Sequence, residues 1–177
     1  MGVTVPVADD LHDIERRESQ LWLLAFFFIF LLAVGIFLMD ATTGERGWQM
    51  KIANGTGGNS VKGNVVVVDA NADLSFDLEP ADGVDPCAVV YEAGIADGSE
   101  AWCWMEGSIC QVLLKDATAA TRGNWARVAV DVAGRATMTS AVPAPPTDAT
   151  HFREIGHCIQ SKDAGADVLA LILFHTT

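Results

Sequence analysis

Positively charged residues are scarce in this sequence of 177 residues. Eleven Lys and Arg stand against 23 Asp and Glu, which gives a formal net charge of −12 at pH 7. Residues 40–177 hold nine of the basic and 18 of the acidic residues, so most of the imbalance lies there. Because an acidic surface repels polyphosphate, this balance argues against sequence-independent binding to nucleic acid.

The sequence also lacks the motifs that carry common catalytic chemistry. It has no Gly-x-Ser-x-Gly and no His-Glu-x-x-His, and no Asp-x-Asp-x-Asp run that could form a calcium loop. The Gly-rich stretch at 55–58 is not followed by the Lys-Ser/Thr of a phosphate-binding loop. We therefore expect no enzymatic activity, no catalytic residues, no cofactor and no metal ion.

Cysteines are few and none forms a Cys-x-x-Cys pair, which argues against a zinc ribbon or a thioredoxin-like motif. The four are Cys87, Cys103, Cys110 and Cys158. If the domain is exported, a disulfide between Cys103 and Cys110 is plausible, because these residues flank a predicted hairpin turn. If it is assembled in a cytoplasm, four free thiols are favoured.

Only one long hydrophobic run occurs, Leu21–Met39, with 19 residues and no charge. As a helix it would span about 28 Å, the thickness of a bilayer core. No small-x-small cleavage pattern follows it, so it predicts an uncleaved transmembrane helix rather than a signal peptide. A hydrophobic helix buried in an oligomer is the alternative. Residues 1–20 are predicted to be a polar tail with a short helix.

From residue 40 onward the pattern is that of a soluble β domain. Residues 40–60 are rich in Gly, Thr and Asn and predict a linker or arm. Residues 61–177 contain short apolar runs bounded by turn residues, with almost no helical periodicity. This predicts a mainly β fold, a small antiparallel β-barrel or sandwich of about eight short strands, preceded by one N-terminal hydrophobic, transmembrane-like helix. We identify no internal repeat in the sequence.

Three local patterns make further expectations. Residues 101–106 and 109–114 predict a hairpin joined through Gly107-Ser108. Residues 169–174 are apolar throughout and predict a central strand buried on both faces. The tryptophans Trp102, Trp104 and Trp125 fit either a packed core or an exposed binding platform.

The carboxyl-terminal part resembles a known class of proteins. The motifs are Ala-Thr-Arg-Gly-Asn-Trp at 120–125 and His-Phe-Arg-Glu-Ile-Gly-His at 151–157, within the wider series 89–99, 111–125 and 151–159. Over residues 50–177 the chain is similar to the capsid-decorating, or cement, proteins and head-fibre domains of tailed phages.

The resemblance implies a non-enzymatic structural protein on the exterior of a virion, which binds the major capsid protein and ties neighbouring subunits together. It also implies a homo-oligomer, with a trimer favoured because it multiplies weak contacts. The residues that we expect at the interface are Arg122, Trp125, His151, Phe152, Arg153 and His157.

The first 49 residues depart from that family, whose members normally need no transmembrane segment. Three explanations remain open. Residues 21–39 tether the module to a membrane, or they form an assembly arm, or the true start lies at Met39 or Met50. The alternative function is a cellular single-pass membrane protein whose acidic β domain binds a ligand or partner outside the cytoplasm.

Overall fold

The computed structural model describes residues 36–140 and 152–176. This part of the chain contains eleven strands and no helix, which confirms the mainly β prediction. The strands are β1 (Ile36–Met39), β2 (Arg46–Asn54), β3 (Val65–Val68), β4 (Ser75–Leu78), β5 (Ala88–Val90), β6 (Glu100–Trp104), β7 (Ile109–Leu113), β8 (Trp125–Val128), β9 (Ala136–Thr139), β10 (Glu154–Cys158) and β11 (Leu169–Phe174).

The end of the hydrophobic run is a strand and not a helix. Ile36–Met39 forms β1, which pairs with β2, so the prediction of a helix to Met39 is wrong for these four residues. The remainder of the predicted helix and the tail 1–20 lie outside the described residues. Within the described ranges, no helix is long and apolar enough to cross a membrane.

The segment 40–60 is not a linker. It contains β2, the longest strand, which alternates between buried and exposed positions from its start. Gly47 and Gln49 are buried, whereas Arg46, Trp48 and Met50 are exposed. The alternation was hidden because the buried positions carry a glycine and an amide instead of apolar side chains.

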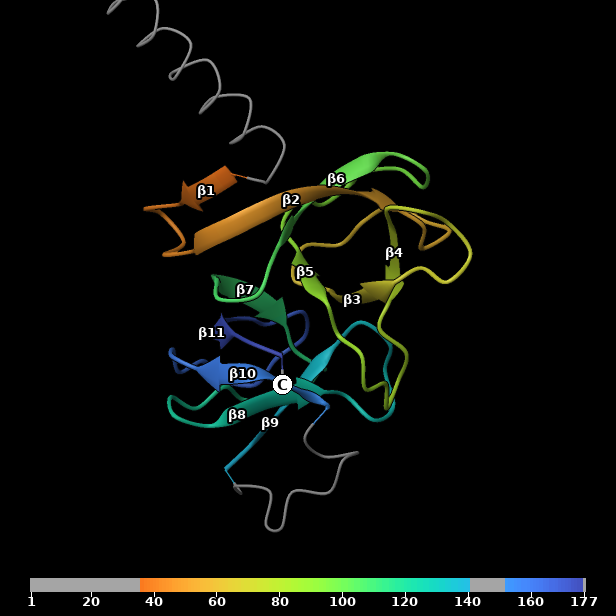
Figure 1. The fold of residues 1–177 in the computed structure, drawn as a ribbon. Helices are drawn as coiled ribbons and strands as arrows, with labels where there is room; N and C mark the ends of the chain where they lie inside the picture. The colour runs from red at the N-terminus through yellow and green to blue at the C-terminus, as the bar shows by residue number, and fades with distance from the viewer. Residues whose placement is uncertain (1–35, 141–151, 177) are drawn as a thin grey trace, which may run out of the picture. The chain divides into compact units, whose positions relative to one another are not determined.

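The strands form one sheet in the order β4-β3-β5-β6-β2-β7-β11-β10-β8-β9, with β1 beside β2 (Figure 1). These neighbours pair antiparallel wherever a register is defined, while β4 also pairs with β2 in parallel through Ala53↔Ser75 and Asn54↔Phe76. With that parallel contact, each of five strands pairs with two others of the same five: β2, β6, β5, β3 and β4.

The predicted hairpin between 101–106 and 109–114 is wrong. Both β6 and β7 run antiparallel along the same strand, β2, through Gln49↔Trp104 and Arg46↔Ile109. Between them the chain bends at residues 105–108, where the Met105 amide donates to the Trp48 carbonyl. Gly107-Ser108 therefore changes the direction of the chain without reversing it, as a bulge does.

The pairing of strands repeats along the chain, contrary to the sequence reading. In the first repeat, β2–β6, the paired neighbours are β2 with β6, β6 with β5, β5 with β3, and β3 with β4. In the second repeat, β7–β11, they are β7 with β11, β11 with β10, β10 with β8, and β8 with β9. A parallel bridge, Leu114↔Ala136, matches the parallel contact of the first repeat.

The registers of the two repeats match residue by residue. Val68 pairs with Phe76 in the first repeat, and Val128 pairs with Ala136, each 60 positions later, in the second. Loop hydrogen bonds match in the same way. The Gly55 amide donates to the Phe76 carbonyl at 2.8 Å, and the Lys115 amide donates to the Ala136 carbonyl at 2.8 Å. The two repeats thus share one fold.

A matching turn precedes β3 and β8, with the sequences Lys62-Gly63-Asn64 and Arg122-Gly123-Asn124. Both glycines adopt a left-handed conformation, with φ of 84° and 87°. The Gly63 amide donates to the Val90 carbonyl on β5, and the Gly123 amide donates to the Cys158 carbonyl on β10, each at 2.8 Å. Each turn is therefore attached to the corresponding strand of its own repeat.

Two apolar clusters form the core, and they show how the repeats meet. Inward side chains of the first repeat, such as Val66 and Phe76, form a cluster of their own. Val65, Val89 and Trp104 instead join the cluster of the second repeat. The first repeat therefore packs one outer face against the second repeat.

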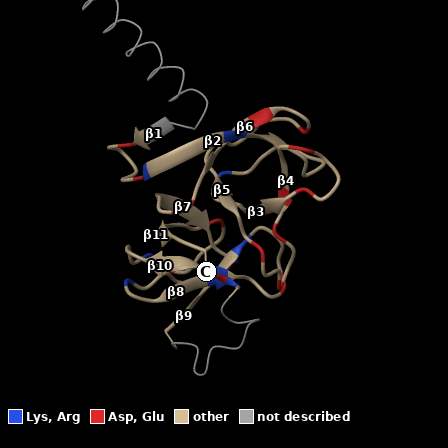
Figure 2. Cartoon of the chain, viewed as in Figure 1, with Lys and Arg blue, Asp and Glu red and all other residues tan. Residues whose placement is uncertain are grey.

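Charge is divided unequally between the two repeats. Residues 46–104 contain three basic and nine acidic residues, whereas residues 109–176 contain six of each. Figure 2 shows acidic residues on β4 and β6 and on the loops beside them. The negative charge of the described chain therefore belongs mainly to the first repeat.

Candidate interaction face

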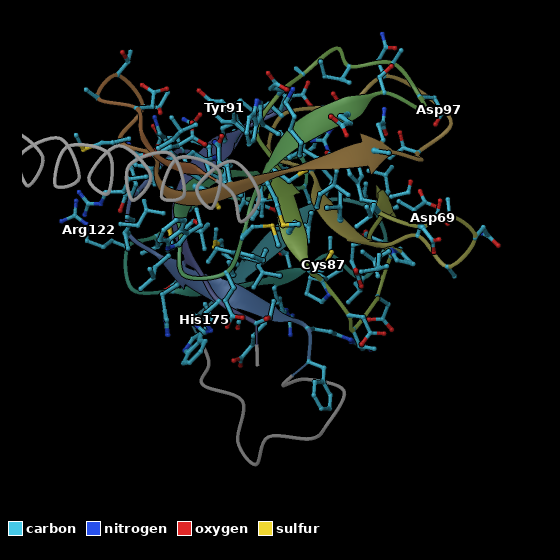
Figure 3. All side chains as sticks on the ribbon, turned by 45° about the horizontal axis from the view of Figure 1, so that its top comes forward. Asp69, Cys87, Tyr91, Asp97, Arg122 and His175 are labelled. Carbon is cyan, nitrogen blue, oxygen red and sulfur yellow. The ribbon has the colours of Figure 1, made fainter. Side chains whose placement is uncertain are left out.

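The outer face of the first repeat is buried against the second repeat. It is formed by Lys62, Val65, Val89, Tyr91 and Trp104, and we call it the first-repeat face. Val65, Val89 and Trp104 are fully buried, and the Tyr91 ring meets the Trp104 ring edge-on at 5.3 Å (Figure 3 labels Tyr91). The Lys62 ammonium lies 4.6 Å from the centre of the Tyr91 ring. Aromatic contacts and burial together fix this face.

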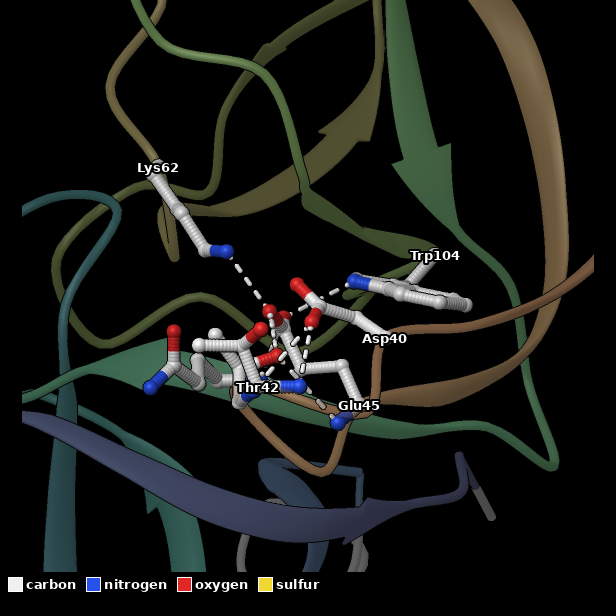
Figure 4. Close-up of polar contacts among 7 residues, drawn as sticks. Asp40, Thr42, Glu45, Lys62 and Trp104 are labelled. Carbon is white, nitrogen blue, oxygen red and sulfur yellow. Dashed lines mark hydrogen bonds and ion pairs between the residues drawn. The ribbon is translucent and has the colours of Figure 1, made fainter.

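A buried carboxylate completes the first-repeat face (Figure 4). Glu45 is fully buried, and its Oε2 accepts from Lys62 Nζ at 2.6 Å. Its Oε1 accepts from the Trp104 indole at 3.0 Å and from the Gln111 amide of β7 at 3.0 Å. Because these donors come from both repeats, Glu45 links the two repeats through charge-assisted hydrogen bonds.

Equivalent positions of the second repeat form a face that is more exposed. They are Arg122, Trp125, His157, Ile159 and Leu173, and we call them the second-repeat face. Leu173 is 40% exposed, Ile159 is 36% exposed, and Arg122 is also exposed. The rings of Trp125 and His157 are half-buried. The surface is apolar at its centre with a cation at its edge, which is typical of protein-binding sites.

Trp125 and His157 form the centre of an aromatic cluster. Their rings lie 3.9 Å apart because β8 and β10 pair these two residues directly. The His175 ring lies 5.1 Å from that of His157 and 6.4 Å from that of Trp125. In Figure 3, Arg122 and His175 lie on the side of the molecule away from Asp69 and Asp97.

The environment of His175 favours its neutral form. Burial lowers the pKa of this histidine below its ordinary value, and the neighbouring His157 lowers it further. The carboxylates of Glu154 and Glu106 act in the opposite direction without reversing the shift. The cluster therefore combines Trp125 and His157 with a His175 imidazole that its surroundings hold toward the neutral form.

The structure brings together three of the six residues predicted at an interface: Arg122, Trp125 and His157. The Arg122 Nε donates to the Ile159 carbonyl at 3.2 Å, which holds the arginine beside the cluster. Phe152 is 45% exposed and directly precedes Arg153. His151 lies outside the described residues.

Arg153 has a different position from the one expected. Its guanidinium pairs with Asp82 at 2.5 Å, and its side chain is only 20% exposed. Since Asp82 belongs to the first repeat and its amide donates to the Ala129 carbonyl, this pair joins the two repeats. The structure thus gives Arg153 a place at the junction between repeats.

The reading of 169–174 as a strand buried on both faces is wrong on one side. β11 is central, between β7 and β10, but its burial alternates and Leu173 is exposed. The exposed side belongs to the second-repeat face. Sequence reasoning missed Leu173, Ile159 and His175 as site residues. The recurrence of Lys/Arg-Gly-Asn was the only signal that could have aligned the two faces.

The three tryptophans do not form one cluster. Trp104 is fully buried in the first-repeat face, and Trp125 lies in the second repeat. Trp102 is half-buried, with the Lys51 ammonium 5.4 Å from its ring. The expectation of a packed core therefore holds for Trp104 alone.

The four cysteines are free thiols in the structure. Burial raises the pKa of Cys103 to about 12 and that of Cys87 to about 11, and it raises the pKa of Cys110 well above its ordinary value. Such thiols carry little thiolate at neutral pH and react slowly. In the described ranges, no group of three or more His, Cys, Asp or Glu side chains is arranged to hold a metal ion.

Comparison with known proteins gives no match, either to the models of protein families or to curated proteins. The class of the protein is defined by its architecture: a mainly β chain of two repeats with one fold. The second repeat covers one outer face of the first repeat, whereas the equivalent face of the second repeat lies at the surface.

Proposed function

We propose that this chain is a non-enzymatic virion structural protein of the capsid-decorating or head-fibre type, which binds the capsid exterior through its second-repeat face. The observation that carries the proposal is the equivalence of the two faces. Where the first repeat buries Val65 and Val89, the second presents Trp125 and His157 at its surface. Because the second repeat covers this face of the first repeat, we expect another protein to cover the equivalent face of the second repeat.

The two motifs behind the phage resemblance support this assignment because they meet at one place. Residues 120–125 form the turn that leads into β8, and residues 154–157 form most of β10. β8 and β10 are paired neighbours, so both motifs contribute to the second-repeat face. The capsid contact therefore includes Arg122, Trp125 and His157.

The remaining parts of the proposal concern the whole assembly. The return of strand pairing within each repeat favours two small β-barrels over a sandwich. The partner is the major capsid protein, and a homotrimer gives the module three contacts at a local three-fold axis. The run 21–39 serves as a membrane tether or an assembly arm.

The test is binding of the full chain, kept in mild detergent, to purified empty capsids from the same source. Wild-type protein should sediment with the capsids, whereas Trp125→Ala should bind at least about tenfold more weakly because a central aromatic anchor is lost. Trp48→Ala is the matched control, since Trp48 is half-exposed and lies in the first repeat. Recovery of the protein only in cell membranes, without capsid binding, would favour a cellular membrane protein instead.

A further inference from the structure

The filled first-repeat face shows what chemistry such a face accepts. Its cation, Lys62, is neutralised by the Glu45 carboxylate. Its apolar part packs against β7 residues, including Cys110 and Val112. Gly63 lies directly against Leu113, whose amide donates to the Gly63 carbonyl at 2.8 Å. The groups that cover the first-repeat face are thus the Glu45 carboxylate and the apolar strand β7.

The second-repeat face offers the same kinds of group at matching positions. Arg122 replaces Lys62 as the cation, and Leu173 replaces Trp104 as a large apolar side chain. Gly123 replaces Gly63, and a methyl group placed on Gly123 would meet no atom within 4 Å. The turn therefore has open space where its counterpart in the first repeat is tightly packed.

In the second repeat, the position that corresponds to Glu45 is occupied by Met105, which has no carboxylate. Glu45 lies directly before β2, at the end of the turn 40–45. The corresponding strand β7 is preceded by β6, and only four residues, 105–108, connect them. Those residues are held along β2 by hydrogen bonds such as that from the Met105 amide to the Trp48 carbonyl.

The charges around the second-repeat face also favour an acidic occupant. Arg122 is exposed, its Nε donates to the Ile159 carbonyl and its backbone amide donates to the Ser161 hydroxyl, so neither bond neutralises its charge. The carboxylates of Glu154 and Glu106 act on His175. Unneutralised arginine beside an aromatic surface selects carboxylate partners by charge and geometry.

We infer that the second-repeat face recognises an acidic segment of the capsid protein, with one carboxylate paired to Arg122 and neighbouring apolar side chains packed on Trp125 and Leu173. The inference rests on the proposed function and adds the chemistry of its partner. It makes the capsid contact an intermolecular version of the contact between Glu45 and Lys62.

The experiment measures capsid binding of full-length variants in mild detergent, over a range of salt concentrations. Arg122→Glu should weaken binding at least about tenfold because it places like charges together, whereas Arg122→Lys should retain most of it. Lys51→Glu makes the same charge change at an exposed lysine of the first repeat and should leave binding unchanged. Thermal unfolding of each variant confirms that the fold is intact.

Restored binding would give the strongest support. An Asp→Arg or Glu→Arg substitution in the capsid protein should recover binding of Arg122→Glu and identify the partner carboxylate. If Trp125→Ala weakens binding but Arg122→Glu does not, the capsid function stands and the acidic partner is wrong. If Arg122→Glu changes only the oligomeric state in sedimentation, the face belongs to a second copy and the inference is overturned. If wild-type protein binds no capsid, both proposals fail.

Discussion

Replacing Glu45 with Gln should destabilise the protein more than any exposed ion pair can. Glu45 is fully buried and accepts four hydrogen bonds, from Lys62 at 2.6 Å, from the Thr43 hydroxyl at 2.9 Å, and from Trp104 and the Gln111 amide at 3.0 Å each. Glutamine keeps the size of the side chain but removes the charge, and it exchanges one acceptor oxygen for a donor. Lys62 is then left without its counter-ion, and one of the other donors meets an NH₂ group.

The magnitude follows from how far water can reach the lysine. Breaking a buried pair costs about 3–5 kcal/mol, because the remaining charge is uncompensated. The Lys62 side chain is 25% exposed, so partial hydration reduces the expected loss of unfolding free energy to about 2–3 kcal/mol.

Urea unfolding followed by tryptophan fluorescence measures this loss. The matched control is Asp131→Asn, which removes an ion pair with Lys115 whose side chains are 37% and 50% exposed. That control should cost less than about 1 kcal/mol. The reasoning is refuted if Glu45→Gln lowers the unfolding free energy no more than Asp131→Asn does.

Three further predictions concern the two repeats and the histidine cluster. Gly63→Ala should lower the unfolding free energy by about 3 kcal/mol or more, and Gly123→Ala should lower it by about 1 kcal/mol. Both glycines have a positive φ, but only a methyl group at Gly63 would meet the Leu113 amide nitrogen, at 2.7 Å. Equal losses of unfolding free energy in urea would contradict the difference between the covered and the exposed face. Ala117→Gly should raise stability by about 0.5–1 kcal/mol, since Ala117 has φ of 61° where the first repeat has a glycine, and an unchanged melting temperature would count against that equivalence. Because the pKa of His175 is lowered in the folded state, the unfolded state binds a proton at this residue more readily. The contribution of neutral His175 to stability is therefore complete above the ordinary pKa of 6.5 and is lost as the pH falls below it. Unfolding at pH 7 and pH 5 should show this loss in the wild type and a smaller loss in His175→Gln.

The β character of the chain was readable from the sequence, with about eight strands expected and eleven found in the described residues. Runs such as 65–68 and 74–78 carry β-branched or alternating apolar residues between turn signals, and both contain strands. β2 was missed because its buried positions include Gly47 and Gln49, which carry no apolar signal.

The two repeats left only a weak signal in the sequence because strand pairing does not require residue identity. Where 49–78 is aligned with 109–138, only the pairs Gly63/Gly123, Asn64/Asn124 and Val68/Val128 are identical. The turn retains Gly and Asn because its left-handed backbone requires them, while each repeat packs its interior with side chains of different size. Phe76 of the first repeat, for example, corresponds to Ala136 of the second.

The site was predicted in part, through motifs and not through geometry. Arg122, Trp125 and His157 were selected because they lie in the two motifs on which the expected resemblance to decorating proteins was based. Leu173 and Ile159 join them only because β10 and β11 are neighbours, and pairing between distant segments leaves no local signal in the sequence.

Hydrogen exchange of the full chain, free and bound to capsids, tests the central claim most directly. If the second-repeat face is the contact, binding should slow amide exchange at residues 121–125 and 157–159, and leave the corresponding residues 61–65 and 89–91 unchanged. Slowed exchange confined to the first repeat, or no change in either repeat on bound capsids, would contradict the claim.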